Sequence, residues 1–413
     1  MLDTTTNLAD LLSDPELLAT QAFIDGSWQN ASSGATFDVM NPARGDVIAK
    51  VADLDRADVA RAIASAEIAQ KAWAARPAKE RSSILRAWFE AIMAAQNDLA
   101  IILTAEMGKP LAEARGEIAY GASFIEFFAE EAKRIYGETI PGHAADKRIT
   151  VIKQPVGVAA SITPWNFPNA MITRKAAPAL AAGCAFVSRP ADLTPLSALA
   201  LGVLAKRAGI PDGVLQIVPS SDASAIGKEF CENPTVRKIT FTGSTAVGRI
   251  LLEQAAPQVK RVSMELGGNA PFIVFDDADL DAAVEGAIAC KFRNNGQTCV
   301  CANRIYVHSP VYDEFSRKFM ARLETMSVGD GLDGADFGPL ISPAAVAKVE
   351  DQISDATSKG ARIALGGARH DLGATFFQPT ILTGVTQDMK VSHEETFGPM
   401  APLFSFDTED EVI

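Results

Sequence analysis

Hydrophobic residues follow two different rhythms along this chain. In the first third they recur at helical spacing, as at Leu85, Phe89 and Ile92, which lie at i, i+4 and i+7 on one face of an amphipathic helix. A second helical pattern runs through residues 110–137 and ends at Gly137. We therefore expect this part of the chain to be helical and poor in strands.

Short runs rich in β-branched residues begin at Ile149 and alternate with helical patterns, such as residues 196–209 and 245–256. The runs cover residues 151–162, 185–189, 214–219, 236–244 and 259–266. Alternation of this kind predicts a mostly parallel sheet with helices on both faces. The pattern restarts after Gly267 and Gly268 with another strand and another helix, so a domain boundary is predicted there.

Length and composition narrow the class of protein. A chain of 413 residues exceeds a single compact core and indicates two or three domains. A hydrophobic content of 48% is typical of a globular protein. The net charge of -13, without any basic run, argues against a nucleic-acid partner and against binding to an anionic membrane surface.

The N-terminal segment and the cysteines indicate the compartment. The segment from Met1 to Gly26 has no basic region followed by an apolar core, so no signal peptide is predicted. No uncharged apolar run is long enough to span a membrane. Five cysteines, an odd and low number, favour a reducing cytoplasm over a disulfide scaffold. Four histidines without metal-like spacing predict no metal site.

The segment from Gly296 to Cys299 carries the strongest chemical signal. A glycine-containing turn near a helix end leaves backbone N–H groups that stabilise a thiolate, so Cys299 is a candidate nucleophile. The alternative is a buried structural cysteine, the usual fate of a free thiol. The polar flank from Asn294 to Thr298 argues against burial in a core.

Three further segments offer groups for the same chemistry. Glu265 stands between apolar residues at a predicted strand end, where it fits either a general base in a dry pocket or a salt-bridged strand terminus. Asn166 lies in a proline-fixed loop after a strand, where its amide suits an oxyanion hole or, alternatively, an ordinary turn. Gly243 and Ser244 precede a predicted helix and suit a diphosphate site or a plain helix cap, although no G-x-G-x-x-G occurs.

Together, five motifs in this order resemble those of the aldehyde dehydrogenase superfamily. They are PWNFP around Asn166, FTGS around Gly243, MELGG around Glu265, GQTC around Cys299 and EETFGP from Glu394 to Pro399. The resemblance runs from about Phe23 to the last residue. It implies an α/β fold with a Rossmann-type cofactor domain, a second α/β catalytic domain and a small β oligomerisation element. The cofactor domain would comprise residues 1–135 and 156–264, and the catalytic domain residues 265–413. The oligomerisation element would comprise residues 136–155.

The resemblance implies a role for each matching residue. Cys299 matches the nucleophile that forms a thioester with the aldehyde, and Glu265 matches the base that activates the deacylating water. Asn166 and the Cys299 amide match the oxyanion hole, and Lys175 matches a lysine of the proton relay. The implied cofactor is NAD, with NADP as the alternative. Its site would comprise Trp165, Arg189, Asp192, Gly243, Ser244, Glu395 and Phe397.

Two of these positions bear on the choice of cofactor. Arg189 stands where the family usually has a lysine, and Asp192 where it often has a glutamate that accepts from the adenosine ribose. A carboxylate there repels a 2′-phosphate and favours NAD. The Arg189 guanidinium has the opposite effect, because it can pair with phosphate.

The stretches 166–175 and 290–304 most resemble succinate-semialdehyde dehydrogenases. We therefore expect succinate semialdehyde as the substrate, with glutarate semialdehyde second. Arg174 and Arg293 match the subfamily's arginines for the distal carboxylate, although a surface arginine is the commoner case. Cys301 matches the partner of Cys299 in a redox pair, with a simple packing role as the alternative.

Several alternatives stay open at this point. A CoA-acylating aldehyde dehydrogenase is one, although such enzymes generally lack the glutamate found at Glu265. An inactive member with a binding or structural role is another, because the chain ends at Ile413, several dozen residues before a typical member, and looks truncated. If the C-terminus were complete, the resemblance would imply a homodimer or homotetramer in the cytoplasm.

Overall fold

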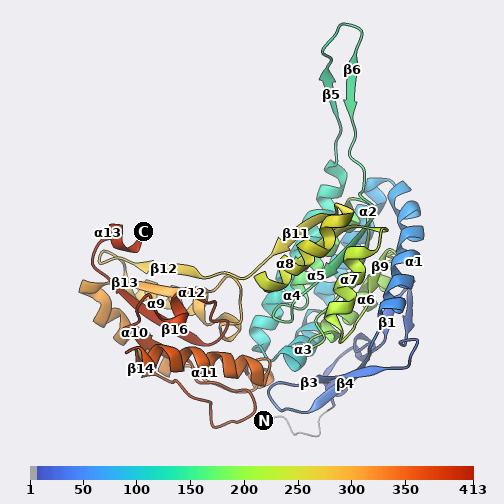
Figure 1. Ribbon diagram of the computed structural model, residues 1–413. Helices are drawn as coiled ribbons and strands as arrows, with labels where there is room; N and C mark the ends of the chain where they lie inside the picture. The colour runs from blue at the N-terminus through green and yellow to red at the C-terminus, as the bar shows by residue number, and fades with distance from the viewer. Residues whose placement is uncertain (1–6) are drawn as a thin grey trace.

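The computed structural model describes residues 7–413. Residues 1–6, the start of the segment in which no signal peptide is predicted, lie outside the described part. Two lobes, each built on its own sheet with helices around it, stand side by side, and a hairpin projects from the first lobe (Figure 1). Among residues 7–413, no helix combines the length and hydropathy that crossing a bilayer requires.

The first lobe contains a seven-stranded sheet in the order β11-β10-β7-β8-β9-β1-β2. Its parallel strands are β7 (Val158–Ile162), β8 (Ala185–Arg189), β9 (Leu215–Ile217), β10 (Val236–Thr242) and β11 (Arg261–Glu265). Two short antiparallel strands, β1 (Ala22–Ile24) and β2 (Ser27–Gln29), extend one edge. Each predicted run contributes a strand, so the mostly parallel sheet is confirmed.

Helices cover both faces of this sheet because its central strands are buried on both sides. Along β7, Ala159 packs into the apolar cluster beneath α5 and α6, whereas Val158 and Ala160 pack into the cluster on the opposite face. The first face holds α2 (Ala78–Ala94), α3 (Gln96–Met107), α4 (Leu111–Glu131), α5 (Ala170–Ala181) and α6 (Leu196–Arg207). The opposite face holds α1 (Arg56–Ala75), α7 (Ala223–Glu232) and α8 (Thr245–Ala255).

The helical predictions for the first third are confirmed, but the expected scarcity of strands is wrong. Leu85 and Ile92 are fully buried on α2, as their spacing indicates. The first 52 residues nevertheless contain β1 and β2, and also β3 (Thr36–Met40) and β4 (Val47–Ala52), which pair with each other. These strands have only three to six residues, which is too short for a period of two to stand out; β1 is buried and the other three are partly exposed.

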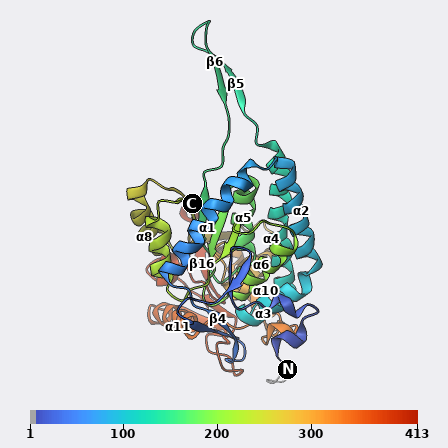
Figure 2. The same cartoon turned by 90° about the vertical axis from the view of Figure 1, so that its right-hand side faces the viewer.

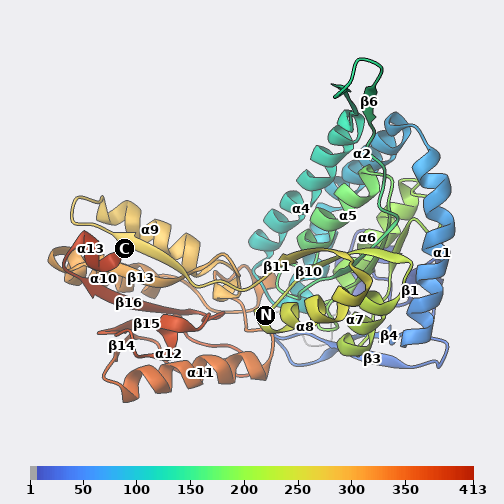
Figure 3. The same cartoon turned by 45° about the horizontal axis from the view of Figure 1, so that its top comes forward.

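The second lobe begins where the sequence pattern restarts. The chain leaves the first sheet after β11 and enters a five-stranded sheet in the order β12-β13-β16-β15-β14. Its strands are β12 (Ala270–Val274), β13 (Ala302–His308), β14 (Arg362–Leu365), β15 (Thr380–Thr383) and β16 (Met400–Phe406). Figure 3 shows α9 (Leu280–Lys291) and α10 (Tyr312–Glu324) on one side of this sheet and α11 (Pro343–Ser358) on the other. Two shorter helices, α12 (Lys390–His393) and α13 (Glu409–Val412), lie close to the sheet.

The hairpin of β5 (Glu138–Pro141) and β6 (Arg148–Val151) extends well away from both lobes (Figures 1 and 2). All eight of its strand residues are exposed, and they include the apolar side chains Ile140, Ile149 and Val151. The hairpin lies within residues 136–155, where an oligomerisation element is predicted. A two-stranded hairpin of this kind is only marginally stable in water when nothing packs against it.

Candidate active site

Cys299 lies at the exit of a tight reversal that follows α9. Asn294 and Asn295 both have φ 54°, and Gly296 has φ 71°, so three successive residues adopt the left-handed conformation. Such strain persists only where the surroundings hold it. Here Ile341 N–H donates to the Gln297 side-chain oxygen at 3.0 Å. The polar flank from Asn294 to Thr298 is buried, although its polarity argues against burial in a core. The Cys299 side chain itself stays partly accessible.

Asn166 reaches the nucleophile segment from the other lobe. It is buried in the loop after β7, and its side-chain amide donates to the Gln297 carbonyl at 3.0 Å. The Asn166 carbonyl in turn accepts from Lys109 Nζ at 2.8 Å and from the Asn294 amide at 3.0 Å. Because an amide nitrogen has two donor hydrogens, one of them remains for a further acceptor.

The Lys109 ammonium is held by a second buried group. Its Nζ lies 2.6 Å from Glu117 Oε2, and both side chains are only 1% exposed. The other Glu117 oxygen accepts from the backbone N–H groups of Asn169 and Ala170 at 3.0 and 3.1 Å, at the start of α5. This ion pair thus fixes the whole loop that carries Asn166.

A pocket of about 550 Å³ brings the predicted substrate residues together with the nucleophile. Cys299, Arg174 and Arg293 all line it. The Arg293 guanidinium lies 5.4 Å from the centre of the Phe167 ring, and Arg174 lies 5.5 Å from that of Phe124. Arg174 is partly buried beside its ring, where an anion is more strongly attracted than in open water, whereas Arg293 is exposed to solvent.

Lys175 and Glu265 line a neighbouring cavity of about 370 Å³, which shares Arg174 with the first pocket. Lys175 is buried on α5 and donates to the Thr242 hydroxyl at 2.6 Å. Burial, followed by the charge of Arg174, lowers the pKa of Lys175 to about 8. Glu265 is exposed. Of the two alternatives for Glu265, the dry pocket is therefore not met, since β11 lies at the edge of the first sheet.

The surroundings of Cys299 shift the pKa of its thiol upward. Burial raises its pKa, and the negative charge of Glu395 adds to that shift. The Cys299 backbone N–H and the charge of Arg174 act in the opposite direction. A raised pKa disfavours the thiolate, which is the reactive form of a cysteine nucleophile.

Gly243 and Ser244 lie where β10 leads into α8. Ser244 caps the helix, and its side chain accepts from Val247 N–H at 3.3 Å. A Cβ atom at Gly243 would come within 2.5 Å of the Phe241 ring, so a larger residue there would require that ring to move. The first residues of α8 are exposed, which leaves the positive end of the helix accessible to an anion such as a diphosphate.

The remaining candidate cofactor residues form two groups. Glu395 accepts from Gly268 N–H at 3.4 Å, and the rings of Trp165 and Phe397 meet edge to face at 5.5 Å. Arg189 lies at the end of β8, is only 4% exposed, and donates to Asp192 at 2.9 Å and to the Ser220 carbonyl at 2.7 Å.

One atom of that second group bears on whether a cofactor fits. Arg189 Nε is buried without a hydrogen-bond partner within residues 7–413. A donor left unpaired in this way, beside a carboxylate, suits a polyhydroxylated ligand, so the residues present fit a dinucleotide.

Cys301 is fully buried two residues after Cys299. Its thiol contacts the Lys291 carbonyl at 3.5 Å, and burial raises its pKa. A disulfide between the two cysteines would therefore require Cys301 to leave this contact.

The comparisons with known proteins agree with this geometry. The family model described as the aldehyde dehydrogenase family matches residues 28–413. The chain belongs to the aldehyde dehydrogenase family. It is 60% identical to the NADP-dependent succinate-semialdehyde dehydrogenase of Escherichia coli K12, over 97% of this chain and 83% of the relative. It is 59% identical to a glutarate-semialdehyde dehydrogenase of Pseudomonas aeruginosa, with the same coverage.

The fold of an aldehyde dehydrogenase is confirmed by solved structures. The crystal structure of succinate-semialdehyde dehydrogenase from Burkholderia pseudomallei superposes with a TM-score of 0.96 at 60% sequence identity. That match covers 97% of this chain and 83% of the other. The two-lobed α/β arrangement is therefore that of the aldehyde dehydrogenase family.

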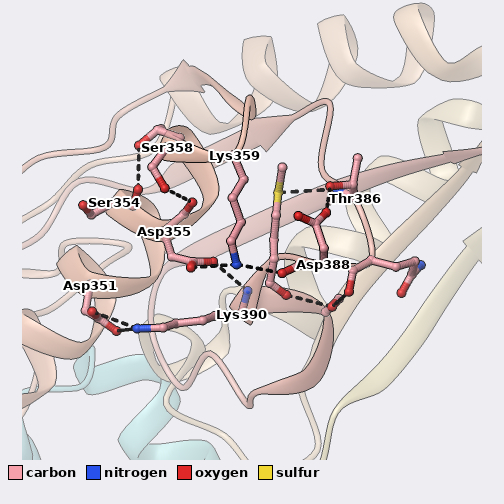
Figure 4. Close-up of polar contacts among 12 residues, drawn as sticks. Asp351, Ser354, Asp355, Ser358, Lys359, Thr386, Asp388 and Lys390 are labelled. Atoms are coloured by element: carbon pink, nitrogen blue, oxygen red, sulfur yellow. Dashed lines mark hydrogen bonds and ion pairs between the residues drawn. The ribbon is translucent and has the colours of Figure 1, made fainter.

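The loop of this aldehyde dehydrogenase that carries Glu395 is anchored by charged residues of α11, which motif reasoning does not single out (Figure 4). Asp355 accepts from the Lys390 backbone N–H at 2.7 Å, at the start of α12. The Lys390 side chain pairs with Asp351 at 2.7 Å, and Lys359 pairs with Asp355 at 2.9 Å. Exposed pairs of this kind contribute little stability, but they fix where α12 begins.

Proposed function

We propose that this protein oxidises succinate semialdehyde to succinate, with NAD or NADP as the hydride acceptor. The observation that carries the proposal is the shared pocket of Cys299, Arg174 and Arg293. It places two guanidinium groups in the same space as the nucleophile, as an aldehyde with a distal carboxylate requires. The names of the E. coli and B. pseudomallei relatives support this substrate.

The first half of the reaction uses groups around Cys299. Cys299 releases its thiol proton to solvent, the resulting thiolate adds to the aldehyde carbon, and the carbonyl oxygen becomes an oxyanion. The Cys299 N–H and the free amide hydrogen of Asn166 stabilise that charge. When bound, the nicotinamide ring supplies the acceptor for the hydride that leaves the same carbon. Arg174 and Arg293 hold the distal carboxylate and keep the aldehyde carbon facing the sulfur.

The second half releases the acid. Glu265 takes a proton from water, the resulting hydroxide attacks the thioester carbonyl, and the Cys299 thiolate leaves. The exposure of Glu265 supports this role, because water reaches its carboxylate directly. Lys175, whose pKa is about 8, exchanges protons between this carboxylate and solvent through the cavity that both line.

The cofactor would be held by residues of both lobes. Gly243 and Ser244 at the start of α8 would bind the diphosphate, and Glu395 the nicotinamide ribose. Trp165 and Phe397 would pack close to the nicotinamide. Arg189 and Asp192 would face the adenosine ribose. The Arg189 ion pair neutralises much of the negative charge of Asp192, so the carboxylate repels a 2′-phosphate less than it would alone.

Glutarate semialdehyde is the second candidate substrate. It differs from the first by a single methylene group, and a pocket of about 550 Å³ accommodates both chain lengths. The glutarate-semialdehyde dehydrogenase of P. aeruginosa, at 59% identity, supports this alternative.

We further propose the division of the chain into its parts and its assembly. Residues 1–135 and 156–264 would form the cofactor domain, 265–413 the catalytic domain and 136–155 the oligomerisation element. The exposed apolar residues of the hairpin support pairing with further copies, as a homodimer or homotetramer. Five cysteines without any disulfide among the described residues support a reducing compartment, the cytoplasm.

A kinetic screen tests the proposed function. The kcat/KM of the protein is measured for succinate semialdehyde, glutarate semialdehyde and butyraldehyde with each cofactor, and the products are identified with and without CoA. We expect the two carboxylated aldehydes to be preferred at least tenfold and the free acid to form in both conditions. A preference for butyraldehyde, or an acyl-CoA product, would contradict the proposal.

A further inference from the structure

Lys291 is a buried lysine whose ammonium is held by hydrogen bonds. It is the last residue of α9, and its side chain is fully buried. Its Nζ donates to the Thr396 hydroxyl at 2.5 Å and to the Asn303 side-chain oxygen at 3.2 Å. Among residues 7–413, no carboxylate forms an ion pair with it. Burying such a charge is costly unless its hydrogen bonds compensate.

The hydrogen bonds of Lys291 belong to a network that joins the separate motifs of the site. The Thr396 hydroxyl also donates to the Asn303 oxygen at 2.6 Å, and the Asn303 amide donates to the Gly268 carbonyl at 3.0 Å. Asn303 follows the nucleophile on β13, Thr396 lies in the Glu395 loop, and Gly268 ends the Glu265 motif. One ammonium therefore ties three chain segments together.

The network ends directly at the Glu395 carboxylate. Gly268 N–H donates to Glu395 Oε1 at 3.4 Å, and a Cβ at Gly267 would come within 2.6 Å of the other oxygen. Phe397 has φ 50°, a left-handed conformation that a phenylalanine rarely adopts. Thr396 lies between these two residues and accepts the Lys291 bond, so a displacement of Thr396 would move both of them.

We propose that Lys291 is a positioning residue for the cofactor: by holding Thr396 and Asn303, it sets the Glu395 carboxylate and the Phe397 ring for the nicotinamide ribose. The inference rests on the proposed function, which assigns Glu395 and Phe397 to the cofactor. It assigns Lys291 a role in binding and orientation, with no part in bond making.

Equilibrium binding in the absence of aldehyde tests this role. The Kd values of NADPH and NADH are measured by nucleotide fluorescence for the unchanged protein and for Lys291→Met, Thr396→Val and the double variant. We expect about a tenfold weaker Kd in Lys291→Met and a smaller loss in Thr396→Val. The loss in the double variant should be smaller than the sum of the two single losses, because both changes break the bond between Lys291 and Thr396. In turnover, KM for the nucleotide should rise more than kcat falls.

Two further variants separate positioning from general stability. Lys260→Met removes a lysine that donates to two backbone carbonyls of the first lobe, those of Asn233 and Val236, at 2.6 and 2.7 Å. It should lower the melting temperature and leave both Kd values unchanged. Lys291→Arg keeps a donor and a charge, and should recover part of the lost affinity.

The outcomes distinguish this inference from the function on which it rests. If Lys291→Met folds and binds both nucleotides as the unchanged protein does, the inference is wrong and the proposed function stands. If Lys291→Met does not fold, Thr396→Val decides, and an unchanged Kd in that variant overturns the inference. If the unchanged protein binds neither nucleotide, the proposed function fails first and the inference fails with it.

Discussion

The side-chain amide of Asn166 donates a 3.0 Å hydrogen bond to the backbone carbonyl of Gln297, two residues before Cys299. Asn166 follows β7 of the first sheet, whereas Gln297 precedes β13 of the second. The bond therefore connects the two lobes beside the candidate nucleophile. It also leaves the second amide hydrogen of Asn166 for a further acceptor.

Replacement of Asn166 should reduce catalysis more than binding. Asn166→Ala removes both the oxyanion donor and the contact between the lobes, so we expect kcat to fall by about 10²- to 10³-fold, the usual cost of one oxyanion-hole donor. KM for the aldehyde should change little. Steady-state kinetics at saturating cofactor measure both constants. A kcat within threefold of the unchanged protein would exclude Asn166 from the oxyanion hole.

Arg174→Ala and Arg293→Ala should each discriminate between aldehydes. Loss of a charged hydrogen-bond partner costs roughly 1.5–3 kcal/mol, or about ten- to a hundredfold in kcat/KM. We expect a loss of this size with succinate semialdehyde and little loss with butyraldehyde, which has no carboxylate. Equal losses on both aldehydes would mean that the two arginines only support the structure of the pocket.

The ion pair of Arg189 and Asp192 should control the choice of cofactor. Because the Asp192 carboxylate repels a 2′-phosphate, we expect NAD to be preferred over NADP. The ion pair with Arg189 makes this preference smaller. Asp192→Ser removes the negative charge and frees the guanidinium for a 2′-phosphate. The ratio of kcat/KM for NADP to that for NAD should therefore rise about tenfold, equivalent to about 1.4 kcal/mol. A ratio that stays constant in Asp192→Ser would show that neither residue reads the 2′ position.

Oxidation tests the predicted pairing of Cys299 with Cys301. If the two thiols form a disulfide, peroxide should inactivate the enzyme and a thiol reductant should restore it. The burial of Cys301 and its contact with Lys291 predict slow inactivation, because the segment must first open. Cys301→Ala should then inactivate irreversibly. If the reductant restores the activity of Cys301→Ala as fully as that of the unchanged protein, Cys301 has only a packing role.

The sequence predicts local features of this protein well and distant partnerships poorly. The parallel strands of the first sheet and the motifs around Cys299 and Asn166 follow from short patterns in which every informative residue is a near neighbour. Nothing near Lys291 in the sequence marks Thr396, which lies 105 residues further on. The ion pair of Lys109 with Glu117 was missed as well, although two charges next to long apolar runs were a usable signal.

The exposure of Glu265 shows a second limit. Whether a strand end is enclosed depends on the position of that strand in the sheet, and β11 lies at an edge. The pattern of apolar neighbours around Glu265 is the same for an edge strand and a central one, so the sequence leaves both a dry pocket and a salt-bridged or solvated strand end open. Topology is set by packing between segments far apart in the chain, and a local pattern does not contain it.

Rapid mixing of the Glu265→Gln variant with succinate semialdehyde and its cofactor tests the thioester mechanism most directly. The variant keeps Cys299 and Asn166 but lacks the base for the second half of the reaction. The account predicts a burst of reduced cofactor close to one equivalent per site, followed by a slow steady rate, and no burst at all in Cys299→Ala. Steady turnover at the unchanged rate in either variant would contradict it.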